Sequence, residues 1–447
     1  MTPTPIHARS KAPVLALAAL TMAVAGVLAS SAAQASGFQL KENSAKALGR
    51  AFAGSTAGPA DISSVVNNPA AMSELEGTVF KADVTLINFE TQYSGPGGVD
   101  ALGQPLSGGD GGDGGLTMPV PAMFFSMPAG ERGRFGVAFT VPYGFTTEYA
   151  KNWVGRYKAV KSKLQSFDGT VSYSYELNDQ LALGVSAIVQ KTSADLTSMV
   201  DYGYFLGDPQ QADGLARITG DATDYGWQAG FLWKITPNDR LAVNYRSEIN
   251  QTLKGRATFH DVPSQLGQIV ALGNFQNTDG RADFATPSTL HLSYWHQFGP
   301  RLGIGFDAAR TDWTSFKELR VQYGSAQPDT VETENWKATM VYALGADYRL
   351  NDNWVLRAGI ASDETPTQDA TRTPRVPDGA RRWLAFGFTY QPSDRLEIDM
   401  GYAHLWVDDA SVNNTPATGT GGPTGTTLVG HFESSANLLG VSASYRF

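Results

Sequence analysis

The sequence predicts an all-β transmembrane barrel of about 14 antiparallel strands with a small N-terminal helical hatch that plugs the lumen. Three observations lead to this fold class. Apolar and polar residues alternate through most of the chain, as they do in barrel strands. Short turns alternate with long polar segments. Residues 36–75, rich in Ala, Ser and Gly, do not alternate.

Residues 1–35 are predicted to be a signal peptide. Arg9 and Lys11 form its basic end, residues 14–28 form its apolar run, and Ala33-Gln34-Ala35 is the expected cleavage site. Loss of this segment removes two positive charges and takes the net charge from −9 to −11. Such acidity argues against nucleic acid as a partner.

The mature chain carries no long apolar run that would suit a membrane helix, and it has no Cys for disulfides. A closed β-barrel is the remaining way to cross a membrane. We therefore expect a multi-pass protein of the bacterial outer membrane, in contact with lipid and lipopolysaccharide.

The end of the chain shows the alternation most clearly. Leu439, Val441, Ala443, Tyr445 and Phe447 share one face, and small or polar residues occupy the other. A strand of a soluble sandwich would also alternate, so this strand alone is only suggestive. The terminal Phe resembles the C-terminal signature of outer-membrane barrels, which implies the barrel assembly machinery as a partner.

Comparable apolar faces recur upstream, and aromatic residues cluster near the predicted strand ends. Residues 181–189, 290–298, 340–350 and 396–402 each alternate in this way. His291 and His296 fall on the second of these strands and are expected to follow its outward alternation. The aromatic residues expected in the interfacial girdles are Trp233, Tyr245, Trp295, Trp354, Trp383 and Trp406.

The connections indicate the topology of a barrel spanning residues 77–447. Six short turns rich in Asn, Asp, Gly and Pro occur near residues 128–132, 178–179, 237–239, 299–300, 351–352 and 392–394. Seven long polar segments lie near residues 95–115, 151–165, 200–220, 257–280, 323–333, 364–379 and 411–430. Thirteen connections give about 14 strands. With this even number, the first and the last strand of the barrel both have their chain ends on the periplasmic side.

Residues 36–76 are expected to be the hatch. Apolar residues at Leu40, Ala47, Leu48, Ala51 and Phe52 have a spacing that suits short helices. The lumen of a barrel this wide cannot be filled by its own side chains. This segment is the only candidate to fill it that is not already a strand.

Several short motifs resemble the FadL/TodX (OmpP1) family of outer-membrane transporters of hydrophobic compounds. Asn68-Pro69-Ala70 looks like the family's NPA motif. The other matches, which follow in family order along the mature chain, are Gly37-Phe38-Gln39-Leu40, Leu48-Gly49-Arg50-Ala51-Phe52, Tyr245-Arg246-Ser247-Glu248, Trp313 with Phe316 and Leu319, Asp352-Asn353-Trp354, and Asp363 through Pro366, Pro377-Asp378 and Arg382-Trp383.

The resemblance implies uptake of long-chain fatty acids or other hydrophobic molecules, with release sideways through an inward kink of the third strand. Pro142, Tyr143 and Gly144 are the predicted gate, because Pro cannot donate to the ladder and Gly loosens the same point. The less favoured alternative is that they mark a strand end next to a loop. We expect the kink between Val141 and Phe145 to lie close to Asn68-Pro69-Ala70. Phe38, Phe139, Tyr143 and Phe145 are the candidate substrate-binding residues.

The predicted pocket is apolar and has at most one cation. The positions that correspond to the polar or cationic groups of the family are Val141, Leu196 and Glu332, which would not attract a carboxylate. Lys191, Arg256 or Lys337 could substitute, or they are simply solvated charges. Fatty acids and neutral aromatic hydrocarbons therefore both stay open as substrates.

Other functional classes have weaker support in the sequence. Asp110 and Asp113 among glycines could suggest calcium, although a flexible outer loop explains them as well. The six His residues form no catalytic or metal-binding spacing, so neither an enzyme nor a cofactor nor a metal site is expected. A general porin and a surface receptor or adhesin remain as alternatives, and we expect a monomer.

Overall fold

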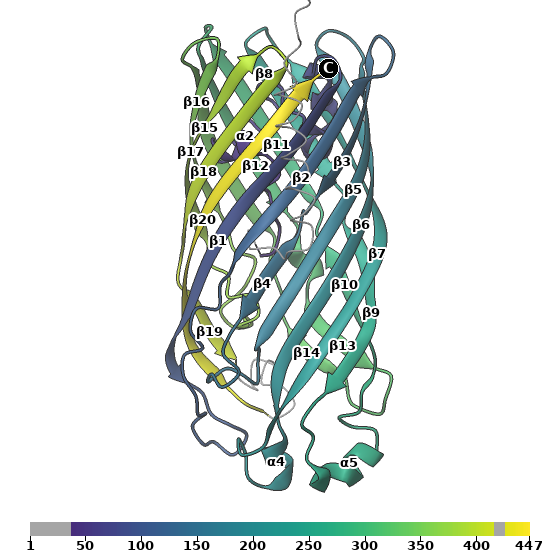
Figure 1. The fold of residues 1–447 in the computed structure, drawn as a ribbon, viewed down its shortest axis with the longest axis vertical. Coiled ribbons are helices and arrows are strands. Elements are labelled where there is room, and N and C mark those ends of the chain that lie inside the picture. Colours follow the sequence, from purple (N-terminus) through teal and green to yellow (C-terminus); the bar gives the residue numbers. More distant parts are fainter. Residues whose placement is uncertain (1–36, 415–424) are drawn as a thin grey trace, which may run out of the picture.

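The computed structural model describes residues 37–414 and 425–447, which form one closed antiparallel sheet around a small plug (Figure 1). The predicted signal peptide, residues 1–35, and Ser36 lie outside the described residues. Within the described part of the chain, no helix has both the length and the apolar character needed to cross a membrane.

The sheet is built from 20 strand segments. In chain order they are β1 (Val79–Gly97), β2 (Thr117–Pro128), β3 (Gly133–Thr140), β4 (Gly144–Glu148), β5 (Lys161–Glu176), β6 (Leu181–Asp201), β7 (Asp213–Lys234), β8 (Asp239–Arg246), β9 (Ile249–Phe259), β10 (Thr278–Thr286), β11 (Thr289–Phe298), β12 (Leu302–Thr311), β13 (Glu318–Tyr323), β14 (Thr330–Thr333), β15 (Thr339–Arg349), β16 (Trp354–Asp363), β17 (Arg381–Ser393), β18 (Leu396–Val407), β19 (Ala410–Asn414) and β20 (Leu428–Arg446).

Six pairs of segments are the two halves of one interrupted strand: β3/β4, β8/β9, β10/β11, β12/β13, β14/β15 and β18/β19. The barrel therefore has 14 strands, as predicted. It closes where β1 pairs with β20, for example at Leu86↔Leu439. The seam between these two strands is therefore hydrogen-bonded from Val79↔Arg446 to Ser94↔His431, which is what lipid requires of a spanning sheet.

The two ends of the barrel differ as the turns predicted. The short turns and the C-terminus lie together at the top of Figure 1, and the long loops lie at the bottom. Two of these loops carry the short helices α4 (Tyr202–Leu206) and α5 (Gly267–Ala271), the second preceded by η2 (Ser264–Leu266). The 3-10 turn η3 (Trp313–Ser315) follows the first half of the ninth strand.

The outward face of the strands is apolar and the inward face is small or polar. In β6, Leu183, Val185 and Val189 are exposed, whereas Gly184 and Ser186 between them are buried. The predicted alternation is therefore correct for this strand, and it places lipid-facing side chains on the outside.

Two predicted girdle residues and one histidine face the other way. Trp295 is only 2% exposed and Trp383 only 4%, because both point inward. The Trp383 ring packs against Phe52 of the plug at 6.3 Å. His291 also points inward and lies 2.7 Å from the Asp307 carboxylate. The local pattern misassigned these residues because it carries no information about what fills the lumen.

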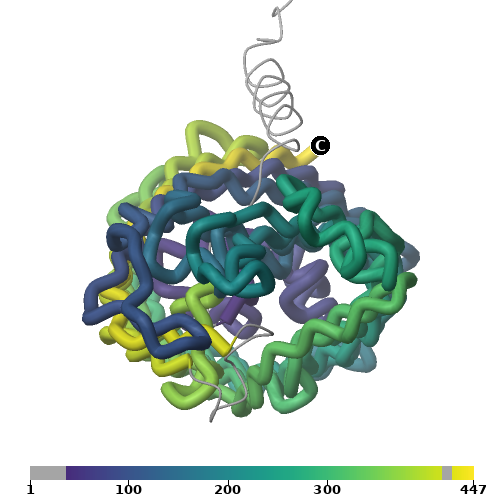
Figure 2. Tube along the Cα trace, turned by 90° about the horizontal axis from the view of Figure 1, so that it is seen from below, coloured from purple at the N-terminus to yellow at the C-terminus, as the bar shows by residue number. Residues whose placement is uncertain are grey.

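The plug lies inside the ring of strands, where Figure 2 shows the purple N-terminal segment. It contains α2 (Ala45–Leu48), α3 (Ser64–Asn67) and η1 (Pro69–Glu74). Helical structure is shorter than the apolar spacing suggested, since Ala51 and Phe52 follow α2 with left-handed backbones, φ 52° and 66°. We call residues 37–76 the hatch.

Candidate functional site

The hatch rests on glycines that face the lumen. Gly184 of β6 and Gly230 of β7 are directly paired across the two strands. A Cβ atom on Gly184 would lie 2.2 Å from the Ala70 nitrogen, and one on Gly230 would lie 2.4 Å from Asn68 Oδ1. Glycine inside a strand is found where another backbone approaches closely. The glycine pair therefore makes room for the Asn68-Pro69-Ala70 motif.

The Asn68 side chain ties this motif to the wall. It is fully buried, and its amide nitrogen donates to the carbonyl oxygens of Phe231 at 3.2 Å and Val243 at 3.3 Å. Its Oδ1 accepts from Ala70 N at 3.1 Å and so caps η1. Both ends of this buried amide are therefore hydrogen-bonded.

The opposite side of the hatch uses the same arrangement. Glycines of neighbouring strands face the hatch backbone so closely that any side chain would collide with it, as at Gly359, where a Cβ atom would lie 2.2 Å from the Arg50 carbonyl carbon. The inward glycines that meet residues 45–54 are Gly305, Gly345, Gly359, Gly387, Gly401 and Gly440.

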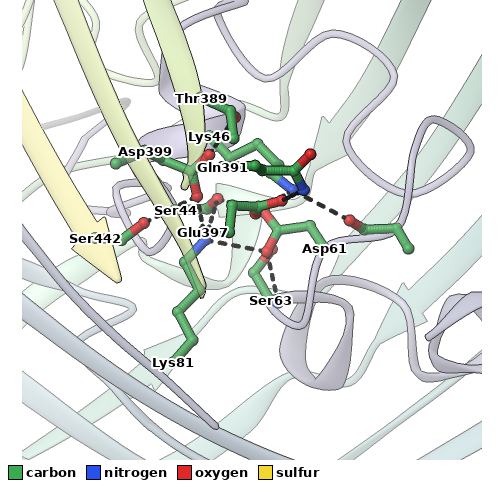
Figure 3. A network of polar contacts seen from close by, with 12 residues as sticks. Ser44, Lys46, Asp61, Ser63, Lys81, Thr389, Gln391, Glu397, Asp399 and Ser442 are labelled. Carbon is green, nitrogen blue, oxygen red and sulfur yellow. Dashed lines mark hydrogen bonds and ion pairs between the residues drawn. The ribbon is translucent and has the colours of Figure 1, made fainter. Parts of the chain in front are cut away.

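Buried ion pairs fix the hatch between these glycines (Figure 3). The ammonium of Lys81 in β1 lies 3.1 Å from Asp61 of the hatch and 3.6 Å from Asp399 of β18. Lys46 of the hatch pairs with Glu397 at 2.5 Å. Burial by itself would raise the pKa of Asp61, but Lys81 and then Lys46 outweigh it and hold that pKa well below its usual range.

The hydrogen-bonded ladder of the barrel wall is interrupted at the third strand. β3 ends at Thr140, β4 begins at Gly144, and the pairing with β5 shifts by one residue between them. β2 pairs with β3 only as far as Met123↔Phe139. Among the described residues, no strand pairs with β4 on the side that faces β2. This leaves a gap in the ladder, at the place where we predicted an interruption.

The hatch takes the position of the missing strand. Leu40 N donates to the Pro142 carbonyl at 2.7 Å, and Gly144 N donates to the Phe38 carbonyl at 2.8 Å. The kink is therefore bonded to the first residues of the hatch. The Asn68-Pro69-Ala70 motif, near which we expected the kink, is bonded instead to β7 and β8.

Phe38 lies at the centre of a cluster of aromatic rings. Its ring centroid is 4.6 Å from Trp313, 5.2 Å from Trp336 and 5.7 Å from Phe145. Beside these rings is an apolar cavity of about 70 Å³, which we call the inner cavity. Its wall includes Phe38, Phe145, Leu164, Leu196, Leu253, Phe284, Phe316 and Val376.

The inner cavity has one largely buried cation on its border. Arg375 donates through Nε to Glu332 at 3.0 Å and through a terminal nitrogen to Ser162 Oγ at 3.1 Å. It comes from the outer segment 364–380, which folds back into the barrel mouth, where Tyr149 donates to the Pro374 carbonyl at 2.9 Å. Arg281, which also borders the cavity, is exposed.

Two further cavities lie on either side of the inner cavity. A depression of about 780 Å³ on the outside of the wall, the outer depression, shares Phe284 and Phe316 with the inner cavity. A third cavity of about 140 Å³, the central cavity, lies over the hatch and is lined by Leu40, Phe52, Pro142 and Tyr143 among others. Phe38 and Tyr143, at a ring distance of 6.4 Å, stand between the inner and central cavities.

Tyr143 is held firmly at this boundary. It is fully buried, its backbone N donates to Ser166 Oγ at 3.1 Å, and its hydroxyl donates to the Pro287 carbonyl at 3.3 Å. The Arg246 guanidinium, which pairs with Asp168 at 2.6 Å, lies 5.9 Å from the centre of its ring.

This geometry can be compared with known proteins. The sequence profile of the family described as outer membrane protein transport protein (OMPP1/FadL/TodX) matches residues 26–447. The chain belongs to this family. It is an outer-membrane transporter of the FadL/TodX type.

Individual members of the FadL/TodX family cover nearly all of the chain. The long-chain fatty acid transport protein of Escherichia coli K12 is 27% identical over 88% of this chain and 93% of its own length. A solved FadL homologue from Pseudomonas aeruginosa is 29% identical, covers 92% of this chain and all of its own, and superposes with a TM-score of 0.86. The toluene transporter TodX of Pseudomonas putida, at 18% identity, 92% and 100% coverage and a TM-score of 0.68, shares the fold.

Within this FadL/TodX member, the structure brings most of the predicted site residues together. Phe38 and Phe145 border the inner cavity, and Pro142 and Tyr143 border the central cavity. Phe139 lies on the outward face of β3, opposite to Gly136, whose Cβ position faces Val65 and Met72 of the hatch. It stacks on Phe167 at 5.6 Å, away from both cavities.

The cations proposed from the sequence do not reach a cavity. Lys191, Arg256 and Lys337 are exposed. Sequence reasoning missed Arg375, and it also missed the contribution of Trp313, Trp336 and Phe284 to the aromatic cluster. One signal was available: three aromatic residues at 313, 316 and 336 flank strand breaks, where the alternation that marks lipid-facing side chains fails.

Proposed function

We propose that this protein takes up long-chain fatty acids and similar hydrophobic molecules, and that it releases them sideways into the membrane between β2 and β4. The observation that carries this proposal is the position of the inner cavity. The inner cavity lies between the outer depression and the wall gap. Its lining is apolar around Phe38, the hatch residue whose carbonyl binds Gly144 at the gap.

The proposed path has three steps. A molecule collects in the outer depression and passes Phe284 and Phe316 into the inner cavity. Movement of Phe38 relative to Tyr143 then opens the way to the central cavity. The last step leads past Pro142 into the gap. The route to the periplasm is blocked by the hatch, which packs closely against the inward glycines of the wall and is fixed by buried ion pairs. Burial of apolar surface favours entry into the inner and central cavities over water.

Arg375 is the residue we assign to the substrate head group. It is 13% exposed, it borders a wall that is mostly apolar but also includes Glu334 and Arg281, and a carboxylate there would exchange with Glu332 as its partner. This assignment favours a long chain with one acidic end. The Escherichia coli K12 relative, at 27% identity, is itself named for long-chain fatty acid transport.

A second candidate substrate class is the neutral aromatic hydrocarbons. The observation in its favour is that Glu332, at 3.0 Å, already neutralises Arg375, so that Arg375 presents no uncompensated positive charge to a ligand. The many rings around Phe38 would suit such a ligand as well.

The test is uptake in a bacterial host that lacks its own fatty acid channel. We expect the wild-type protein to accelerate entry of a radiolabelled C16 fatty acid, and Arg375→Gln to lower that rate while toluene entry stays unchanged. Faster entry of toluene and none of fatty acid would instead favour the second class. Ion conductance in liposomes without uptake of either probe would contradict both and indicate a porin.

A further inference from the structure

Strand β2 contains two prolines in the half that borders the wall gap. Pro119 and Pro121 lie between Thr117 and Met123, and β2 remains paired with β1 along this whole stretch, up to Asn88↔Thr117. Proline inside a sheet removes a donor from the ladder, and it is normally confined to edges and bulges. The position of these two prolines therefore needs an explanation.

The hydrogen bonds to β1 show which way the prolines are directed. Phe89 N donates to the Leu116 carbonyl at 3.1 Å, in the same register as the pair Ile87↔Met118. In an antiparallel ladder, both polar groups of a residue face the same neighbour, and successive residues alternate. The even-numbered residues of β2 thus face β1, so Pro119 and Pro121 face the other neighbour.

The turn at the far end of β2 leads to the same conclusion independently. Ala129 N donates to the Gly133 carbonyl at 2.8 Å, in the register that continues to Met123↔Phe139. The odd-numbered residues of β2 therefore face β3. A ladder continued beyond Met123 would set Pro121 opposite Val141 and Pro119 opposite Tyr143. Instead, the Tyr143 carbonyl accepts from Ser166 N at 2.9 Å.

We propose that Pro119 and Pro121 prevent the side opening from closing, because they remove the two N–H groups that residues 119 and 121 of β2 would otherwise present to the gap. An N–H group at either position would lack a partner in an apolar setting, and closing the ladder onto the third strand would satisfy it. Proline leaves no such donor, so at these two positions the open edge carries only carbonyl acceptors, and closing the ladder would satisfy no N–H group there. This proposal rests on the sideways release proposed above and assigns positioning residues to it.

The opposite margin of the gap is treated in a complementary way. There, the Gly144 donor is bound by the Phe38 carbonyl at 2.8 Å, and the Glu148 donor is bound by the Gly114 carbonyl at 3.0 Å. One margin thus lacks the donors of residues 119 and 121 because of proline, and on the other margin the hatch and the first outer loop bind the donors of Gly144 and Glu148. An opening without free N–H donors suits the apolar part of a substrate, because that part of the molecule has no acceptor and would leave such donors unpaired.

The experiment compares Pro119→Thr/Pro121→Thr with Pro128→Thr, a control in the same strand whose added N–H, like that of every even-numbered residue of β2, faces away from the third strand. Heat-modified mobility on gels selects correctly folded barrels. Hydrogen exchange then reports on the new amides at positions 119 and 121, and uptake of radiolabelled C16 fatty acid reports on transport. We expect amides protected at least a hundredfold, uptake reduced at least tenfold, and a control that behaves like wild type.

The outcomes separate this proposal from the proposed function. Protected amides with unchanged uptake would support the role of the prolines and contradict release at this gap. Amides that exchange as fast as those of an open loop would overturn the role of the prolines, whatever the uptake. If the double variant does not fold, Pro121→Thr alone adds one donor opposite Val141, and the same two measurements decide.

Discussion

The hatch meets the barrel wall in two different ways, at β6–β8 and at β2–β4. All 21 residues of β6 pair with β7, and the hatch lies on this complete ladder where Gly184 and Gly230 leave room for it. At the third strand the ladder stops at Met123↔Phe139, and the backbone of Phe38–Leu40 supplies the missing bonds.

The difference teaches that hydrogen bonding, more than side-chain size, decides whether the wall is sealed. A glycine pair lets a second backbone approach without breaking a single ladder bond. Where a proline interrupts the ladder, lipid would leave polar groups unpaired unless other protein groups bind them. The hatch therefore closes the barrel at one place and stabilises an opening at another.

The largest effect is expected from restoring the ladder at the third strand. Pro142→Val together with Gly144→Val supplies the missing donor and side-chain cover opposite β2. We predict at least a tenfold loss of uptake of a hydrophobic substrate, with a barrel at least as resistant to heat as the parent. Measured uptake equal to that of the parent would place the exit elsewhere in the wall.

A second large effect is expected from disrupting the contact between the hatch and the complete ladder of β6 and β7. In Gly184→Val, the Cβ position alone lies 2.2 Å from Ala70 N, so the hatch has to move away from β6. We predict a several-fold rise in ion conductance in planar bilayers. The matched control is Gly169→Val in β5, where a Cβ atom meets nothing within 4 Å, and its conductance is expected to stay at the parental level.

The sequence alone was sufficient for the fold because the relevant signals are local. Alternation, turn residues and loop lengths each depend on a few neighbouring residues, and together they gave the strand number and the plug. The same reasoning found Asn68, Pro142 and Gly144, since proline and its neighbours constrain the backbone wherever they occur.

The cavities could not be predicted in this way. Arg375 reaches the inner cavity only because an outer segment folds back into the barrel, and Trp295 and Trp383 face inward because the hatch lies there. These placements depend on contacts between residues hundreds of positions apart. One usable signal was overlooked: the strand interiors carry glycines on their polar face, at 184, 230, 345, 359, 387, 401 and 440, and such glycines indicate a close backbone.

An intermediate effect is expected from Asn68→Ala. It removes two donors to wall carbonyls and the cap of η1, and leaving such buried groups unpaired costs about 1–3 kcal/mol. We predict faster hydrogen exchange in residues 64–74 and reduced uptake from a folded barrel. Asn68→Asp keeps the cap acceptor but loses both donors, so it should be at least as damaging; a normal Asn68→Asp protein would show that the wall bonds do not matter.

The smallest effect concerns Glu42. In the chain it lies between Phe38–Leu40, which bind the third strand at the gap, and the helix α2, which packs against inward glycines of the wall. It is 1% exposed, and burial raises its pKa to about 7, although the backbone N–H groups of Glu42 and Lys41 partly oppose this. Lys41 N donates to its Oε2 at 2.8 Å, whereas Oε1 has no partner among the described residues. Protonation therefore favours the seated hatch.

The sign of the pH effect follows from this shift. Because the pKa of Glu42 is higher in the seated hatch than the ordinary 4.5, its contribution to hatch stability is fully present below pH 4.5 and is lost as the pH rises through 7, by roughly 3 kcal/mol at most. We predict that hydrogen exchange of residues 38–48, corrected for the intrinsic rate, accelerates between pH 5.5 and about 8 in the parent. Glu42→Gln cannot ionise, so its corrected exchange should be flat over that range. A parent without this acceleration, or a Gln variant that retains it, would show that another group controls the side of the hatch that binds the gap.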